Sequence, residues 1–124
     1  MPAYDFYVAQ LRFVATRTER QSAEVSAMMA ALESFADNLE ASATIDVPYE
    51  DAKITGRALA GVAGFLQQHI LPETVAAENR LAEVQVRWVI DTSMSLTAAL
   101  TVHAETVTDG SSCQFDLPAP PVVD

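Results

Sequence analysis

Residues 84–104 read VQVRWVIDTSMSLTAALTVHA, and this stretch decides the predicted fold. Apolar residues occupy most of its even positions, whereas most of the odd positions between them are polar. A period of two is typical of a β-strand that has one buried and one solvated face. On a helical wheel the apolar residues scatter around the whole circumference, which disfavours a helix. The pattern therefore predicts β-structure over about residues 84–107.

The phase of this alternation also predicts where the strand turns. Residues that face each other across an antiparallel pair lie on the same face of the sheet. A three-residue loop at residues 91–93 pairs Ile90 with Met94 and Trp88 with Leu96, so that apolar residues oppose apolar residues. A single long bent strand is the alternative. Asp109 and Gly110 end the element in either case.

Three helices are predicted before this hairpin. Residues 22–41 carry apolar side chains at spacings of three and four, and a second helix begins at Pro48 and runs to about Leu71. A third, short helix follows over about residues 73–82. Within the second helix, Gly56, Ala60 and Gly64 form a stripe of small residues, which predicts close packing against another helix.

The N-terminal residues 5–17 fit two patterns. Tyr4, Tyr7, Leu11 and Val14 continue the helical spacing, so one helix from about residue 4 to residue 41 is an alternative. Aromatic and β-branched residues are dense in this segment, however, and these favour a strand. The strand is the prediction that we carry forward.

The predicted fold class is α+β, with helices packed on one face of a small antiparallel sheet. The sheet consists of the long C-terminal hairpin over about residues 84–107, with an added N-terminal strand. We expect residues 1–110 to form a single domain, and residues 111–124, which include Pro118, Pro120 and Pro121, to form an extended or disordered tail. Such a small sheet has open edges, which predicts a homo-oligomer.

The chain is strongly acidic. Its 124 residues include 17 Asp and Glu against seven Lys and Arg, and the last basic residue is Arg87. Nucleic acids and anionic membranes both require clustered basic side chains, so direct binding to either is not expected. The N-terminus shows no secretory signal and one cysteine allows no internal disulfide, so we expect a cytoplasmic protein.

No residue pattern indicates catalysis, a cofactor or a metal. His103 and Cys113 with Asp109 would make a thiol–imidazole pair, but nothing in their spacing brings them together. Asp46, Glu50 and Asp51 lack the glycine of a calcium-binding loop. His69 is explained by its place at a helix end, where a cation is favoured.

The sequence therefore predicts a non-enzymatic, acidic protein-binding module, such as an adaptor, a chaperone-like protein or an inhibitor of a basic or nucleic-acid-binding protein. One alternative is a structural subunit of a larger homo-oligomeric assembly, such as a phage or compartment particle. Another is a small-ligand-binding domain. The predicted partner-binding residues are Asp46, Glu50, Asp51, Arg87, Asp91, His103 and Glu105.

Overall fold

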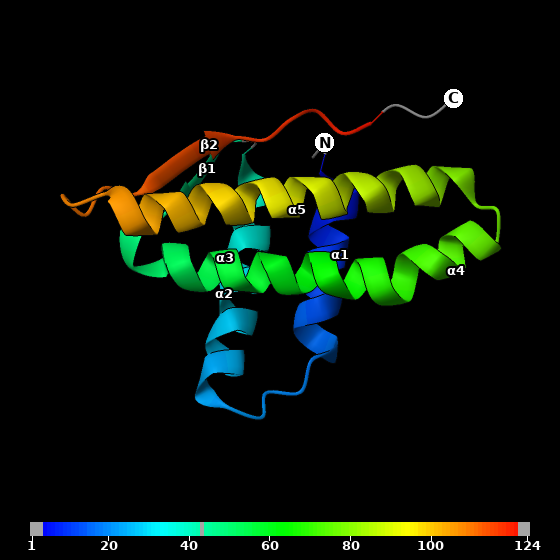
Figure 1. The fold of residues 1–124 in the computed structure, drawn as a ribbon, viewed down its shortest axis with the longest axis horizontal. Helices are drawn as coiled ribbons and strands as arrows, with labels where there is room; N and C mark the ends of the chain where they lie inside the picture. Colours follow the sequence, from blue (N-terminus) through cyan, green and yellow to red (C-terminus); the bar gives the residue numbers. More distant parts are fainter. Residues whose placement is uncertain (1–3, 43, 122–124) are drawn as a thin grey trace.

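The computed structural model describes residues 4–42 and 44–121 and is mostly helical (Figure 1). Two strands form a small antiparallel sheet, so the α+β class is correct at this level. The elements in chain order are α1 (Asp5–Arg17), α2 (Ala23–Ala41), β1 (Thr44–Val47), α3 (Tyr49–Phe65), the π-helical turn η1 (Leu66–Ile70), α4 (Leu71–Ala76), α5 (Arg80–Thr106) and β2 (Cys113–Asp116).

A long helical hairpin is the main structural unit. One arm runs through α3, η1 and α4 with little interruption, and the other arm is the 27-residue helix α5 (Figure 1). The side chain of Asn79 caps α5 by accepting a hydrogen bond from the backbone N–H of Ala82. At 1.5 Å per residue, α5 is about 40 Å long.

The predicted β-hairpin over residues 84–107 is wrong, because these residues belong to α5 and the coil after it. The buried residues of α5 are Val86, Val89, Ile90, Thr92, Ser93, Leu96 and Leu100. Their spacing is helical, but two of them are polar, and the apolar Met94 and Val102 are exposed. The arrangement of apolar residues alone therefore concealed the helical face.

The predicted N-terminal strand is also wrong, because α1 covers these residues. The helical face that the sequence offered as the alternative is the buried one, with Tyr7, Leu11 and Val14 in the core. The two helices are nevertheless separate, since Ser22 caps α2 by accepting from the N–H of Val25. Arg12 joins them by ion pairs to two carboxylates of α2.

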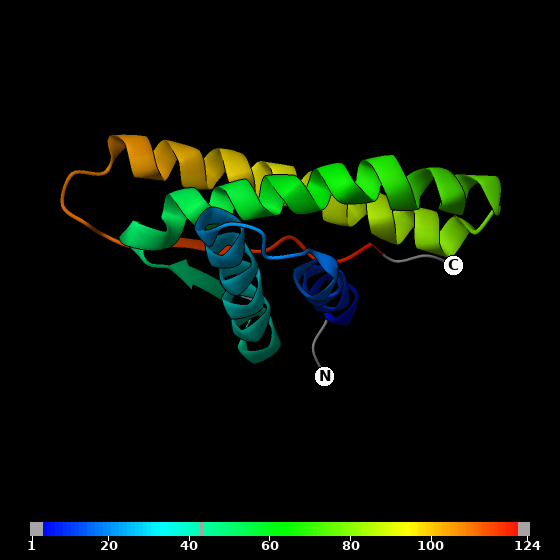
Figure 2. The same ribbon diagram turned by 90° about the horizontal axis from the view of Figure 1, so that it is seen from below.

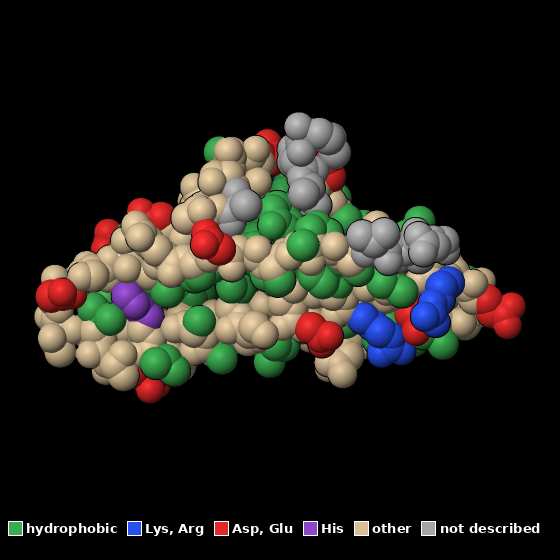
Figure 3. Space-filling model, turned by 90° about the horizontal axis from the view of Figure 1, so that it is seen from above, with side chains coloured by type: hydrophobic (Ala, Val, Ile, Leu, Met, Phe, Trp, Pro, Cys, Tyr) green, Lys and Arg blue, Asp and Glu red, His purple; other side chains and the backbone are tan. Residues whose placement is uncertain are grey.

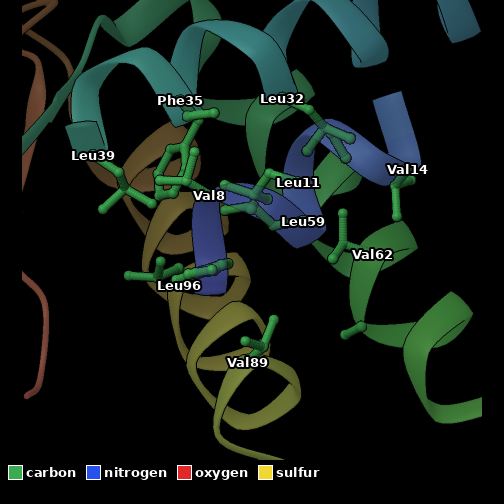
Figure 4. Packing of buried hydrophobic residues seen from close by; sticks show 14 of the residues in the cluster. Val8, Leu11, Val14, Leu32, Phe35, Leu39, Leu59, Val62, Val89 and Leu96 are labelled. Carbon is green, nitrogen blue, oxygen red and sulfur yellow. The ribbon is translucent and has the colours of Figure 1, made fainter. Parts of the chain in front are cut away.

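Helices α1 and α2 cross one face of the long hairpin and build the core with it (Figure 2). Figure 4 shows that buried apolar side chains of helices α1, α2, α3 and α5 point toward one another. Those labelled are Val8, Leu11 and Val14 of α1, Leu32, Phe35 and Leu39 of α2, Leu59 and Val62 of α3, and Val89 and Leu96 of α5. The hairpin extends beyond α1 at the end where α4 lies (Figures 1 and 2).

The small two-stranded sheet lies beside the C-terminal end of α5 (Figure 1). Strand β1 pairs antiparallel with β2, with Val47 opposite Cys113 and Thr44 opposite Asp116. Ile45 and Val47 are buried, so β1 contributes to the core as well as connecting α2 to α3. Part of the predicted tail thus forms a strand, and residues 122–124 lie outside the described residues.

The two glycines of the small-residue stripe on α3 pack differently. A Cβ on Gly56 would lie 3.5 Å from the Cβ of Leu100 on α5, whereas a Cβ on Gly64 would meet nothing within 4 Å. The Oγ1 of Thr97 also donates to the carbonyl of Gly56 at 3.0 Å. The prediction of close helix packing is correct at Gly56 and wrong at Gly64.

Candidate protein-binding groove

An open groove of about 290 Å³ lies between α2 and the first turns of α3. Its walls are mainly apolar, and buried Phe35 and Val47 form part of the lining. The lining residues are Ala27, Ala30, Ala31, Ser34, Phe35 and Asn38 from α2, and Val47, Pro48, Asp51, Ile54 and Thr55 from β1 and α3.

The groove exists because α2 presents short side chains toward α3. Ala27, Ala31, Ser34 and Asn38 recur at spacings of three and four, which places them on one side of the helix. Side chains this short do not span the space to α3, which the chain enters through the extended residue Pro48. The row of small residues on α2 is the sequence signal for the groove, and the sequence analysis missed it.

Charges differ between the two ends of the groove. Near the start of α2, Glu24 forms an ion pair with Arg57 of α3, so these charges are already paired. At the other end, Asp51 is the charged residue of the lining, and it is exposed. Glu50 precedes it in the first turn of α3, where both carboxylates are favoured by the helix dipole.

Five of the seven predicted partner-binding residues come together at this end of the molecule. The aromatic ring of Tyr49 packs against His103 with 6.0 Å between ring centroids, and its hydroxyl donates to the carbonyl of Ala104. The start of α3 therefore lies against the end of α5. The five residues at this end are Asp46, Glu50, Asp51, His103 and Glu105.

His103 lies in the last turn of α5 rather than in a strand of the predicted β-hairpin. Its Nε2 donates to the carbonyl of Ser111 at 2.6 Å. Hydrogen bonds from Ser111 lower the pKa of Asp109, and the nearby His103 adds a smaller effect. These contacts hold the loop between α5 and β2, so His103 has a structural role.

Arg87 and Asp91 lie elsewhere, on helix α5 rather than in the predicted β-hairpin. They line a hollow of about 120 Å³ together with Gln67, Leu71 and Ile90. Arg87 also pairs with Glu83 one turn earlier in the same helix. On the face in Figure 3, Lys and Arg side chains gather toward one end, and the other end carries Asp, Glu and His side chains.

Cys113 does not have the environment of a nucleophile. It lies buried in β2, and burial raises the pKa of its thiol, with a further contribution from the charge of Asp46. A raised pKa disfavours the thiolate that nucleophilic chemistry requires. His103, the base considered for it, is hydrogen-bonded to Ser111.

Within residues 4–42 and 44–121, no three His, Cys, Asp or Glu side chains are placed to hold a metal ion. None of the helices in this part of the chain is both long and apolar enough to cross a membrane. In comparisons with known proteins, no family model, curated protein or solved structure matches the chain.

Proposed function

We propose that this chain is a non-enzymatic protein-binding module that takes an apolar segment followed by Lys or Arg into the groove between α2 and α3. The observation that carries the proposal is the groove itself, with apolar walls and an exposed carboxylate, Asp51, at one end. An apolar floor with a charged rim is the usual anatomy of a protein-binding site.

The groove is large enough for a few side chains from one face of a partner helix, but not for a whole protein surface. Its alanines allow the backbone of a partner helix to approach α2 closely, as small residues do at other helix interfaces. The chain has a formal net charge of −10, so long-range attraction also favours a basic partner.

The test uses a synthetic probe, a fluorescent helical peptide with Ala and Leu on one face and Lys at the end that follows this apolar segment. We expect binding by fluorescence anisotropy, and we expect the affinity to fall steeply as salt is added. A peptide in which Glu replaces every Lys is the control for charge and should bind weakly. Equal binding of both peptides would contradict the proposal.

Two pairs of variants locate the site. Ala31→Trp fills the groove and should abolish binding, whereas Ala9→Trp on the exposed face of α1 should leave it unchanged. Asp51→Asn removes the carboxylate of the groove, and Asp5→Asn removes the matched first-turn carboxylate of α1. Only the first member of each pair is expected to weaken binding.

A small-ligand-binding domain is the second candidate, and the same groove favours it. A volume of about 290 Å³ lies at the small end of the range for such pockets. A ligand that binds the folded chain raises its thermal stability by mass action. Stabilisation by small apolar molecules in wild type but not in Ala31→Trp would favour this candidate over peptide binding.

A further inference from the structure

Helix α5 has a second side chain row that faces away from the core. The exposed large hydrophobic residues among those described are Val75, Leu81, Met94 and Val102, and three of these four lie on α5. Met94 is 49% exposed and Val102 is 58% exposed. We define the outer row of α5 as Arg80, Val84, Arg87, Asp91, Met94, Ala98, Val102 and Glu105.

The outer row has the spacing of a helix–helix interface. Its members recur at intervals of three and four residues, which keeps them on one side of the helix along its full length. Val84 is half-buried and the other seven residues are exposed. Met94 and Ala98 are neighbouring apolar members of the row, and the charged Asp91 precedes them.

The charges along the outer row have a definite order. Both cations, Arg80 and Arg87, precede both carboxylates, Asp91 and Glu105. Arg80, Asp91 and Glu105 take part in no ion pair within the described part of the chain. A helix that lies antiparallel on this row should therefore have carboxylates at its C-terminal end and cations at its N-terminal end.

The α5 helix of a second copy meets this requirement. We propose that two copies of this chain pair through their outer rows, with the α5 helices antiparallel about a two-fold axis between residues 92 and 93. In this register Arg80 meets Glu105 of the partner subunit, and the two-fold axis repeats the pair at the other end. At the centre, Met94 lies opposite Asp91 of the partner subunit, so two Met94 and two Asp91 side chains gather around the axis.

The parallel alignment is less favourable, because it sets all four charged residues of the row against their own copies, whereas the antiparallel alignment does so only at Asp91. It sets Arg80 against Arg80 of the partner subunit and Glu105 against Glu105 of the partner subunit, and like charges at helix contacts are unfavourable. The antiparallel alignment also opposes the two helix dipoles favourably. This surface is separate from the groove between α2 and α3, so the inference does not depend on the proposed function.

The first test measures the mass of the purified chain by analytical ultracentrifugation over a wide range of concentration. We expect the mass to double as the concentration rises. Met94→Glu should give a monomer, whereas Val75→Glu, which changes a similarly exposed side chain on α4, should leave the dimer intact. Circular dichroism should show the same helix content in both variants. A wild-type chain that stays monomeric would overturn the proposal and leave the outer row to a different protein.

The second test reverses charges at residues 80 and 105 to check that these two residues face each other in the dimer. Arg80→Glu and Glu105→Arg should each weaken the dimer by about tenfold, since each places like charges at both ends of the interface. The double variant Arg80→Glu/Glu105→Arg restores opposite charges and should recover the wild-type affinity. A double variant that dimerises no better than either single variant would overturn this register.

The third test distinguishes antiparallel from parallel pairing by disulfide cross-linking, with Cys113→Ala as the background. Met94→Cys lies about 4.5 Å along the axis from its copy and should cross-link on oxidation. Val102→Cys lies about 28 Å from its copy and should not cross-link. Cross-linking of Val102→Cys, alone or together with Met94→Cys, would overturn the antiparallel arrangement.

Discussion

The hydroxyls of Tyr7 and Ser93 share a buried hydrogen bond of 2.7 Å, which joins the N-terminal helix α1 to the centre of α5. Both side chains are fully buried, at 0% exposure. The rings of Trp88 and Tyr7 pack in a T-shaped arrangement, with ring centroids 5.6 Å apart. This polar contact fixes the position of α1 on the long hairpin.

The costs of removing the two hydroxyls of this pair should not add. Tyr7→Phe leaves the Ser93 hydroxyl buried without a partner, at a cost of about 1–3 kcal/mol in the free energy of unfolding. Ser93→Ala leaves the Tyr7 hydroxyl in the same position. The double variant should therefore be less destabilised than the sum of the two single variants. Urea unfolding at one fixed protein concentration measures this, and additive effects would contradict the coupling.

Tyr7 also predicts a loss of stability at high pH. Burial raises the pKa of Tyr7 far above its ordinary value, and the hydrogen bond with Ser93 offsets this only in part. Folding therefore favours the protonated side chain. The contribution is complete below the unfolded pKa of about 10, and above it stability falls by up to about 1.4 kcal/mol per pH unit.

The measurement compares urea unfolding of wild type and Tyr7→Phe at about pH 9 and about pH 11. The stability difference between the two proteins should shrink or reverse at the higher pH. Other groups titrate equally in both proteins and cancel in this comparison. A difference that stays constant with pH would contradict the role assigned to Tyr7.

The sequence predicted the helices of residues 22–41 and 48–71 well because their buried faces are almost purely apolar. It failed at α5 for two physical reasons. The inner face includes the buried polar residues Thr92 and Ser93, and the outer row includes the exposed apolar residues Met94 and Val102. Ser93, Met94 and Val102 fit a period of two, because the polar residue stands at an odd position and the apolar residues at even positions. The absence of Gly and Pro between residues 80 and 109 was the contrary signal.

The candidate site was predictable only in part. The acidic residues Glu50 and Asp51 stood out because charge at a helix start is visible in the sequence. That His103 and Glu105 lie at the same end depends on the antiparallel packing of α3 on α5, which the predicted β-hairpin did not include. The groove itself depends on how far α2 and α3 stand apart, and local sequence carries little information on that distance.

Substitution of alanine for glycine should change the stability of this chain differently at Gly56, Gly64 and Gly110. Gly64→Ala adds a Cβ in open space and replaces a poor helix former, so it should stabilise the chain by about 0.5–1 kcal/mol. Gly56→Ala meets only an ordinary contact with Leu100 and should be tolerated. Gly110→Ala should destabilise by about 1 kcal/mol, because φ of +77° at Gly110 disfavours a side chain. Urea midpoints measure all three, and destabilisation by Gly64→Ala would contradict the open position.

Asp46 should control the titration of Cys113. Its negative charge contributes to the raised pKa of the Cys113 thiol, although burial is the larger cause. Asp46→Asn should therefore lower this pKa toward its ordinary value, but not fully. The pH profile of alkylation by iodoacetamide measures the shift. Asp5→Asn on α1 is the control and should leave the profile unchanged.

Glu78 occupies a backbone conformation that suits glycine. Its φ of 57° lies in the left-handed region, in the turn between α4 and α5, and its backbone N–H donates to the carbonyl of Val75. A residue with a Cβ pays about 1–2 kcal/mol in this region. Glu78→Gly should therefore stabilise the chain by about 1 kcal/mol. Glu73→Gly, in the helical backbone of α4, should instead destabilise it by about 1 kcal/mol. Both variants lose one negative charge, so a difference between them in urea unfolding reports the backbone effect alone. Equal changes in stability of the same sign would contradict this explanation.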